Sequence, residues 1–407
     1  MFFYRLLSGL IFITFFPYLA LRFRGRERME RFGMTRHEIK RCIWLHAASL
    51  GEVNALKTLI NELLNKYNQI DFVLSTMTRT GQEAARSISP KLITVFLPFD
   101  VTFIMKNLFK RINPSLIILA ETEFWPNMLH RAKKNGVPVM MVNARLSDKS
   151  YPRYRRSGFI WKPVWKAIIA VNAQSETDAQ RFERLGFRNV QNTHNLKFCL
   201  NLPDYDRNKL RRELGFADDD YILVWGSSRS GEEKLLLRIL PKLKEKISNL
   251  KIVLVPRHLH RIPEIKAIFK TQEFILYTQL APDKQLLIVD EMGILNTFYA
   301  LSDLAIVGGS FYDFGGHNPL EPAYYGKPII IGNYHYSCRD SVDRLKENYG
   351  IVISKKDKLL DDLLKIYDDI RFAADLGANA KRTLDLNSDS LSLNLQVIDG
   401  YIKPATQ

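Results

Sequence analysis

The feature that most constrains the fold is a regular alternation of short apolar runs with segments of helical periodicity. Ten apolar runs of this kind occur, at residues 42–45, 72–75, 116–119, 137–142, 167–171, 221–225, 252–255, 286–289, 304–307 and 328–331. Such an alternation is typical of parallel strands joined by crossover helices. A polar stretch at residues 201–208 divides the runs into two series of five. We therefore predict two Rossmann-like domains of similar size.

The length and apolar content agree with two domains. A chain of 407 residues is too long for one ordinary core, and a hydrophobic content of 46% is ample for two. In open parallel sheets, ligands bind beyond the carboxyl ends of the strands, and the polar motifs of this chain follow such ends. We expect a reaction cleft between the two domains.

The first 26 residues predict a membrane anchor. Residues 6–21 are uncharged and mostly apolar, and they lie between Arg5 and a set of downstream arginines, Arg22, Arg24, Arg26 and Arg28. Their length falls just short of a usual membrane span, and Pro17 could kink the helix. A cleaved signal peptide is the alternative, but no small-x-small site precedes the arginines. Because the arginine excess lies downstream, we expect the body of the chain to be cytoplasmic.

The charge balance indicates anionic partners. Lys and Arg number 59 and Asp and Glu 43, which gives a net charge of +16. Residues 131–166 hold ten basic residues against the single acid Asp148, interleaved with the aromatic residues Tyr151, Tyr154, Phe159, Trp161 and Trp165. No recognised nucleic-acid motif is present, so beside an anchor this stretch predicts a membrane-surface patch. Core packing could account for some of the aromatic residues.

A glycine-rich segment follows the apolar run at residues 304–307. Residues 308–316 supply glycines where a backbone must approach a ligand closely. Asn318 is the predicted N-cap of the next helix, with Pro319 as its first residue and Glu321 as its third. The free N–H groups of such a helix start favour an anion, and the segment predicts a site for a nucleotide-linked sugar donor.

Two other strand ends of the second series add to this site. Arg257 ends a strand-like run and is placed to bind a phosphate or carboxylate, although an arginine that merely ends a strand fits equally well. Met292 and Gly293 precede a short helix and could let a base or ribose approach the backbone. The turn at residues 226–233 supplies small residues and backbone donors, but it lacks the spacing of a Walker loop.

The first series carries acidic residues at its strand ends. Ser49 and Glu52 form a capping box, which alone would explain both residues. Glu52 as a general base is the other interpretation, because a carboxylate at a helix N-terminus stays ionised and lies where a substrate would bind. Glu121 could orient a partner or stabilise cationic character, whereas we assign Glu123 to the start of the following helix. The three widely spaced cysteines argue against both a disulfide framework and a zinc site.

Taken in order, these segments resemble the Kdo transferases of lipopolysaccharide synthesis. That family moves 3-deoxy-D-manno-octulosonic acid (Kdo) from CMP-Kdo to a lipid A precursor. The resemblance covers nearly the whole chain and rests on residues 49–52, 121–127, 143–147, 195–198, 256–258 and 308–321. It implies a GT-B fold, with two Rossmann-like domains that face each other across a cleft. The implied parts are an anchor at residues 1–26, an acceptor-binding domain at 27–200 and a CMP-Kdo-binding domain at 201–407.

The resemblance also implies a chemistry and a set of site residues. The transfer would be inverting, would need no metal or other cofactor, and would occur on the cytoplasmic face of the bacterial inner membrane. Glu52 would be the base, and Glu121 and Lys197 would support the transition state. Contacts to CMP fall on Pro256, Arg257, Met292, Gly293, Ile294, Asn318, Pro319, Leu320 and Glu321. The implied partners are CMP-Kdo as the donor substrate, an anionic lipid A precursor of the lipid IVA type as the acceptor, and the membrane surface through residues 1–26 and 131–166, with no nucleic acid.

Four positions depart from the family pattern. Arg229 stands where a histidine is usual, His194 for a glycine, Cys199 for an acidic residue and Ile294 for a more polar one. The changes at positions 194 and 199 put the geometry around Lys197 in doubt. Ile294 can still contribute its backbone.

Two rival functions use the same motifs. Another membrane-associated GT-B glycosyltransferase, with a UDP-sugar and a lipid acceptor, would share the fold and the helix at residues 318–321. It would not be expected to carry residues 121–127 and the Lys197 segment together. An inactive nucleotide-binding scaffold is disfavoured because Glu52, Lys197 and Arg257 are all present.

Overall fold

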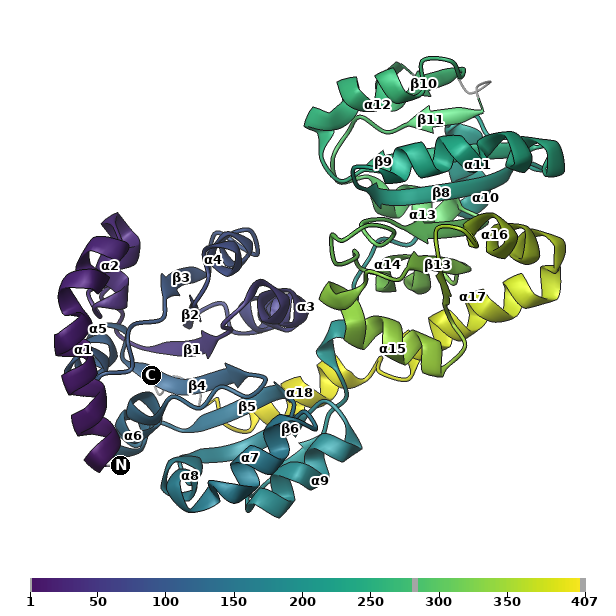
Figure 1. The fold of residues 1–407 in the computed structure, drawn as a ribbon. Helices are drawn as coiled ribbons and strands as arrows, with labels where there is room; N and C mark the ends of the chain where they lie inside the picture. Colours follow the sequence, from purple (N-terminus) through teal and green to yellow (C-terminus); the bar gives the residue numbers. More distant parts are fainter. Residues whose placement is uncertain (1, 280–284, 403–407) are drawn as a thin grey trace. The chain divides into compact units, whose positions relative to one another are not determined.

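Each predicted series of strands forms one parallel sheet with helices on both faces (Figure 1). The computed structural model describes residues 2–279 and 285–402. The chain divides into a first unit, which runs to Cys199 and resumes at Asn387, and a second unit, Leu200–Leu386. The prediction of two Rossmann-like domains is confirmed.

The first sheet has the strand order β3-β2-β1-β4-β5-β6-β7, with all neighbours parallel. Its strands are β1 (Cys42–His46), β2 (Asp71–Thr76), β3 (Ile93–Phe96), β4 (Pro114–Ala120), β5 (Val139–Ala144), β6 (Ile168–Ala173) and β7 (Val190–Asn192). The helices between them are α3 (Leu50–Lys66), α4 (Arg79–Arg86), α5 (Thr102–Ile112), α6 (Pro126–Lys134), α7 (Ser150–Arg156), α8 (Gly158–Trp165) and α9 (Glu176–Leu185). The strand order reverses between β1 and β4, which is where doubly wound sheets bind ligands.

Both faces of the first sheet are buried, so its strands are apolar throughout. Along β1, Cys42 and Trp44 belong to one core, whereas Ile43 and Leu45 belong to the core on the other face. Successive side chains of a strand point to opposite faces, and helices cover both of them. This is why the sequence shows continuous apolar runs instead of strict alternation.

The second sheet has the order β10-β11-β9-β8-β12-β13-β14, again with parallel neighbours. Its strands are β8 (Tyr221–Ser228), β9 (Leu250–Pro256), β10 (Phe274–Leu276), β11 (Leu286–Ile288), β12 (Leu304–Val307), β13 (Ile329–Gly332) and β14 (Val352–Ser354). The α-helices are α10 (Arg207–Glu213), α11 (Glu232–Lys246), α12 (Ile262–Ile268), α13 (Leu295–Leu301), α14 (Leu320–Tyr324), α15 (Arg339–Glu347), α16 (Leu359–Asp368) and α17 (Ile370–Asp385). The order reverses between β8 and β12, so the glycine-rich segment after β12 follows a strand at the reversal.

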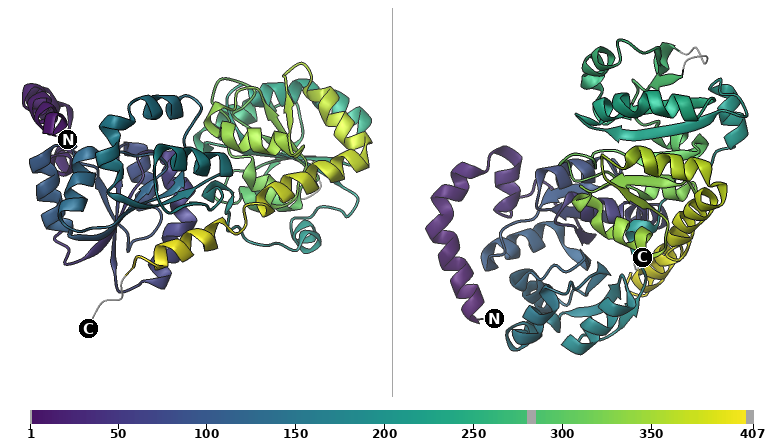
Figure 2. Two further views of the ribbon diagram at one scale, coloured as in Figure 1. Left: turned by 90° about the horizontal axis from the view of Figure 1, so that it is seen from below. Right: turned by 45° about the vertical axis from the view of Figure 1, so that its right-hand side comes forward.

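The last described helix belongs to the first unit, and here the domain prediction is corrected. The sequence assigned residues 201–407 to one domain, but α18 (Ser390–Asp399) packs beside α3 (Figure 2). Ile398 is fully buried in the core of the first unit. Asn172 Nδ2 on β6 donates to Asn394 Oδ1 at 2.9 Å, with both side chains buried. The apolar side chains of α18 therefore complete the first core.

The N-terminal segment forms the predicted helix, α1 (Phe2–Arg22), which α2 (Gly25–Arg31) follows. Residues Phe3–Arg22 are long and apolar enough to cross a membrane, by length and composition, and only 6% of the most apolar window is buried. Phe12 is buried against the rings of Phe32 and Phe99. The helix thus contacts the first unit along one side, and its membrane role stays a prediction.

The aromatic part of the predicted patch at residues 131–166 is wrong. The buried strand β5 lies within this range, and Trp165 is itself buried. Tyr151, Tyr154 and Trp161 are partly buried and pack against the same core. The side chain of Phe159 lies outside the described residues. What remains at the surface is a set of cations on α6, α7 and α8.

Candidate active site

Two strands that meet at the reversal of the first sheet position the predicted catalytic carboxylates. β1 is hydrogen-bonded to β4, and His46 near the end of one pairs with Leu119 of the other. Glu52 lies in the first turn of α3, which follows β1, and Glu121 directly follows β4. The carboxyl ends of both strands are at the same edge of the sheet, where ligands bind in this fold.

The carboxylate of Glu52 is held at the start of α3. Ser49 is the N-cap, and its Oγ accepts from the Glu52 N–H at 3.4 Å and donates to Glu52 Oε1 at 2.8 Å. The Ala48 N–H donates to Oε2 at 2.7 Å. Burial raises the pKa of Glu52, while these hydrogen bonds and Lys197 oppose that rise. Ser49 therefore caps the helix as predicted, but the return bond of Glu52 goes to the N–H of Ala48 and not to that of Ser49 as in a standard capping box. These contacts also fix the carboxylate at the edge of the site.

Glu121 and Lys197 form an ion pair beside Glu52. Lys197 Nζ lies 3.2 Å from Glu121 Oε1, and the charges of both residues act on the pKa of Glu52. Lys197 lies on the 3₁₀ turn η1 (Leu196–Phe198). Asn143 Oδ1 accepts from the Leu196 N–H at 3.0 Å, which fixes this turn to the end of β5. The structure thus brings together the three residues predicted as catalytic.

The two departures near Lys197 are accommodated. His194 has φ of +58°, in the left-handed region that favours glycine, so the backbone has the conformation that a glycine would adopt most easily. The Cys199 thiol donates to the Asn387 carbonyl at 3.3 Å. The turn that carries Lys197 forms with both substitutions in place.

Sequence reasoning missed the role of Glu123. It assigned this residue to the start of α6, but Asp100 accepts from the N–H groups of Asn127 and Met128, each at 2.9 Å. Glu123 instead lies beside the buried His46, with 3.9 Å between Oε2 and Nε2. Burial raises the pKa of Glu123 to about 7, and the negative charge of Glu52 adds to the rise. A two-residue spacing after a strand does not say which way a side chain points.

The predicted donor residues form a second cluster in the second unit. Arg257 follows β9, and its N–H donates to the Ser228 carbonyl at 3.1 Å. Burial raises the pKa of Glu321, while Asn318 and the charge of Arg257 lower it. Arg257, Asn318 and Glu321 therefore lie close enough to interact electrostatically.

The helix after the glycine-rich segment starts slightly later than predicted. α14 begins at Leu320, and Pro319 occupies the cap position instead of the first helical position. Asn318 Oδ1 still accepts from the Leu320 N–H at 3.1 Å, as a capping residue does. Pro319 and Leu320 are buried, so any role they have toward a ligand lies with their backbone.

The remaining predicted contacts lie at two strand ends. Pro256 is buried at the end of β9, whereas the Met292 side chain is exposed. Gly293 has φ of +89° with open space at the position of a Cβ, and Ile294 follows as the N-cap of α13. A backbone of this shape leaves room for a close approach.

Three backbone N–H groups of the glycine-rich segment are paired with a side chain of the same unit. The fully buried carboxylate of Glu232 accepts from the N–H groups of Gly309, Ser310 and Phe311 at 2.9, 3.0 and 3.1 Å. It also accepts from the Arg229 N–H at 2.9 Å. Glu232 therefore joins the loops after β8 and β12, and the sequence marked it only as part of a small-residue turn.

Cationic and imidazole groups surround this junction. Arg229 Nη1 is hydrogen-bonded to His258 Nε2, and its guanidinium lies 5.0 Å from the centre of the Phe314 ring. Burial lowers the pKa of His317 to about 4, and the charges of Arg257 and Arg229 lower it further. Such a concentration of positive charge favours an anionic ligand.

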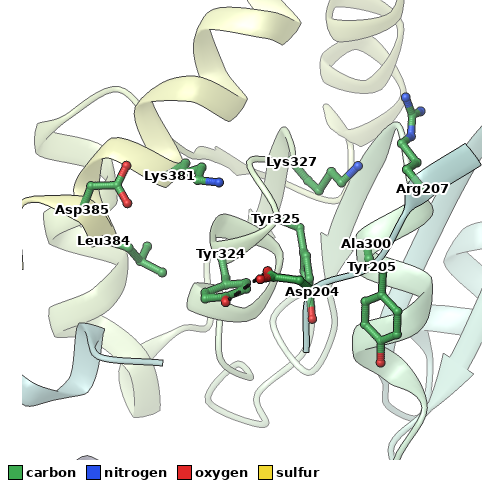
Figure 3. A pocket seen from close by; sticks show the side chains of 10 residues that line it. All are labelled: Asp204, Tyr205, Arg207, Ala300, Tyr324, Tyr325, Lys327, Lys381, Leu384 and Asp385. Carbon is green, nitrogen blue, oxygen red and sulfur yellow. Dashed lines mark hydrogen bonds between the residues drawn. The ribbon is translucent and has the colours of Figure 1, made fainter. Parts of the chain in front are cut away.

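A separate cavity of about 460 Å³ lies in the second unit, and none of the predicted donor residues lines it (Figure 3). Tyr324 OH donates to the Leu202 carbonyl at 3.1 Å and Tyr325 OH to the Pro203 carbonyl at 3.0 Å. Two tyrosines at the end of α14 thus fix the linker that enters this unit. Among residues 2–279 and 285–402, no group of three or more His, Cys, Asp or Glu side chains is placed to hold a metal ion.

Residues 26–200 match a family model described as 3-deoxy-D-manno-octulosonic-acid transferase (kdotransferase). A 3-deoxy-D-manno-octulosonic acid transferase of Haemophilus influenzae is 32% identical over 355 residues, which is 84% of this chain and 83% of that protein. The chain belongs to the Kdo transferase family. It is therefore a glycosyltransferase, and the resemblance predicted from its motifs is confirmed.

Other matches bear on length and fold. A bifunctional glycosyltransferase/methyltransferase of Fusobacterium nucleatum is 34% identical over 75% of this chain, and the match spans about half (49%) of that longer protein. The crystal structure of a glycosyltransferase from Rickettsia africae, 14% identical, covers 91% of this Kdo transferase family member and 100% of that chain, with a TM-score of 0.52. The fold match supports the GT-B class expected for the family.

Proposed function

We propose that this Kdo transferase family member moves Kdo from CMP-Kdo to a phosphorylated glucosamine disaccharide of the lipid IVA type. The transfer inverts the anomeric carbon and takes place at the cytoplasmic face of the bacterial inner membrane. The observation that carries the proposal is the Glu52 carboxylate, which Ala48 and Ser49 hold beside the Glu121–Lys197 ion pair. A fixed carboxylate at a helix start is suited to remove a proton from an acceptor hydroxyl.

The chemistry follows from that placement. Glu52 takes the proton of the acceptor hydroxyl as its oxygen attacks the anomeric carbon of Kdo. The bond from that carbon to the CMP oxygen breaks, and its electron pair leaves with the phosphate. Attack opposite the leaving group inverts the centre. Glu121 stabilises the positive character that develops on the sugar, and Lys197 neutralises the departing negative charge.

The second unit supplies groups suited to CMP. We propose that Arg257 and Arg229, whose charges both act on His317, neutralise the phosphate, and that Glu321, on which the charge of Arg257 acts, accepts from the ribose hydroxyls. CMP leaves as a monophosphate, which carries less charge than a diphosphate, so we propose that these side chains suffice without a metal. The acceptor is anionic and lipid-linked, and both α1 and the cations on α6, α7 and α8 suit its presentation at a membrane.

The test is transfer itself. The full chain is incubated with CMP-Kdo and a tetra-acylated lipid A precursor in EDTA, and the product is analysed by mass spectrometry. Addition of one or more Kdo units supports the proposal. No addition of Kdo overturns the proposal. Addition of a sugar from UDP-sugars supplied in parallel overturns it in favour of the rival glycosyltransferase. If transfer is lost only when EDTA is present, Kdo transfer stands and only the proposal that no metal is needed is contradicted.

Glu52→Gln tests the base. The amide keeps one acceptor for the cap but cannot take a proton, so we expect kcat to fall by about 10²–10⁴-fold. The melting temperature should change little, because the start of α3 remains capped by Ser49. Glu62→Gln, a partly exposed position on the same helix, is the matched control and should transfer at the normal rate. Retention of turnover in Glu52→Gln would remove Glu52 from the mechanism.

A further inference from the structure

A fully buried histidine faces the third carboxyl group of the site. His46 Nδ1 lies 3.1 Å from the Ser75 carbonyl oxygen and 2.9 Å from Ser75 Oγ. Because a carbonyl only accepts, we assign the ring proton to Nδ1. The neutral ring then presents a lone pair at Nε2. That atom is buried without a hydrogen-bond partner and lies 3.9 Å from Glu123 Oε2.

This geometry calls for one proton between the two residues. An ionised Glu123 would place a negative oxygen opposite the lone pair of His46, and the 3.9 Å between Oε2 and Nε2 is too long for a hydrogen bond to offset that repulsion. A protonated Glu123 removes the repulsion. The proton could instead reside on the ring as an imidazolium. Complete burial disfavours that charge and lowers the pKa of His46 to about 4. The proton therefore belongs on Glu123.

The surroundings of Glu123 point the same way. The titratable groups that face it come from four elements: His46 on β1, Glu52 on α3, Glu121 after β4 and Tyr154 on α7. Two hydrogen-bond donors and the start of α3 stabilise a negative charge on Glu52, and the ion pair with Lys197 stabilises one on Glu121. The indole N–H of Trp125 lowers the pKa of Glu123, but it does not reach hydrogen-bond geometry with any acceptor in the described part of the chain. Of the three carboxyl groups, Glu123 has the weakest support for a negative charge.

We infer that Glu123 is a positioning residue that keeps its proton up to about neutral pH, beside the lone pair of His46, and thereby keeps a third negative charge away from Glu52 and Glu121. The inference rests on the proposed function. CMP-Kdo carries a phosphodiester and a carboxylate, and the acceptor carries phosphates. An ionised Glu123 would repel these substrates and would favour the protonated form of Glu52. Its neutrality admits anions to a site that must also keep an ionised base.

The first experiment needs no turnover. The full-length protein and the Glu123→Gln variant are compared by infrared spectroscopy across a pH series. We expect a protonated-carboxyl band that disappears with a midpoint near neutral pH and is absent from the variant. The pKa of Glu123 is raised from its ordinary 4.5 to about 7. The folded state therefore retains a proton that the unfolded chain loses, and the residue destabilises the fold increasingly as pH rises through this window.

Thermal melting checks that linkage. Glu123→Gln should melt at a higher temperature than the natural protein at about pH 8, and the difference should shrink toward about pH 5. Glu183→Gln, an exposed position on α9, should show no such pH-dependent difference. A Glu123→Gln variant that retains the band, or melts below the natural protein at the higher pH, would overturn the inference.

Kinetics then test the consequence for catalysis. For the natural protein we expect kcat/KM to fall by up to tenfold per pH unit above the pKa of Glu123, mostly through a rising KM for the anionic substrates. Glu123→Gln should lack this alkaline fall. An alkaline fall that persists unchanged in the variant contradicts the role, even if the infrared band behaves as expected.

Two safeguards keep the outcomes distinct. If neither protein transfers Kdo, the proposed function fails, while the infrared and melting results still decide the protonation of Glu123. If Glu123→Gln does not fold, Glu123→Asp keeps an ionisable group one methylene farther from His46. Its carboxyl band should then titrate at a lower pH than that of Glu123, and an unshifted band would contradict the contact with His46.

Discussion

At the scale of single residues, three neighbouring carboxyl groups differ in their hydrogen-bond donors. Glu52 accepts hydrogen bonds from the Ala48 N–H and the Ser49 hydroxyl, and Glu121 forms an ion pair with Lys197. Among the described residues, Glu123 has neither kind of partner and lies beside the neutral imidazole of His46. Environments of this kind drive the pKa values of like groups apart, which is how one site holds both ionised and protonated acids. The surroundings of Glu52 and Glu121 therefore favour a negative charge more than those of Glu123 do.

The role of Lys197 can be tested through the pH dependence of its neighbour. The positive charge of Lys197 favours the ionised form of Glu52, so its removal should raise the pKa of Glu52. In Lys197→Gln we expect the acidic limb of the kcat/KM profile to move to higher pH. We also expect kcat at the optimum to fall by about 10²-fold, because support for the leaving group is lost.

The matched control for Lys197 is Lys57→Gln, an exposed position on α3. Both profiles should be measured with the same donor and acceptor concentrations, after melting curves confirm that the variants are folded. A fall in kcat without any shift of the acidic limb would separate Lys197 from Glu52. A normal kcat would remove Lys197 from the transition state.

At this scale the sequence placed Glu52, Glu121 and Lys197 together because each is part of a recognisable motif. It missed Glu123 and His46, whose relation depends on which atom of a buried ring carries the proton. It also missed Asp100, which caps α6 from an earlier loop. Contacts between residues far apart in sequence, fixed by side-chain direction, leave no local signal.

At the scale of elements, the four strands that the sequence missed are the four edges of the two sheets. All ten predicted strands are present, whereas β3, β7, β10 and β14 were not predicted. Edge strands have one neighbour instead of two and are often short. Three of the four have three residues and are only partly buried, so their apolar runs are too brief to stand out.

The junction of two loops in the second unit depends on one buried carboxylate. Each oxygen of Glu232 accepts two backbone N–H groups, from residues 229 and 309 at Oε2 and from 310 and 311 at Oε1. In Glu232→Gln the amide nitrogen would face two of these donors. Leaving two buried N–H groups unpaired costs about 2–5 kcal/mol, and the glycine-rich loop should lose its shape.

We therefore expect Glu232→Gln to lower the melting temperature of the protein and to weaken CMP binding in calorimetry by at least about tenfold. Glu245→Gln, at an exposed position on the same helix α11, should leave both measurements unchanged. Normal CMP affinity in Glu232→Gln would mean that the loop does not depend on this carboxylate.

At the scale of the whole molecule, the chain enters the second unit near Leu200 and returns to the first at Asn387. The entering linker is tied to α14 by Tyr324 and Tyr325. The sequence predicted the first crossing from its polar stretch but not the second. A short amphipathic helix such as α18 can cover either core, and its periodicity does not say which one.

The return of α18 makes the stability of the first unit depend on residues distant in sequence. Ile398 is fully buried in the first core, whereas Gln396 on the same helix is exposed. Ile398→Asp removes a buried side chain and introduces a charge that the core cannot solvate. The first unit should lose at least about 2 kcal/mol of unfolding free energy.

Calorimetric melting should then show a lowered transition for the first unit in Ile398→Asp, while CMP affinity, which we assign to the second unit, stays normal. Gln396→Asp introduces the same charged side chain on the solvent side of α18 and should melt as the natural protein does. If Ile398→Asp weakened CMP binding and left the first unit's transition in place, α18 would belong energetically with the second unit. The two measurements together therefore decide which core α18 completes, because we assign CMP binding to the second unit alone.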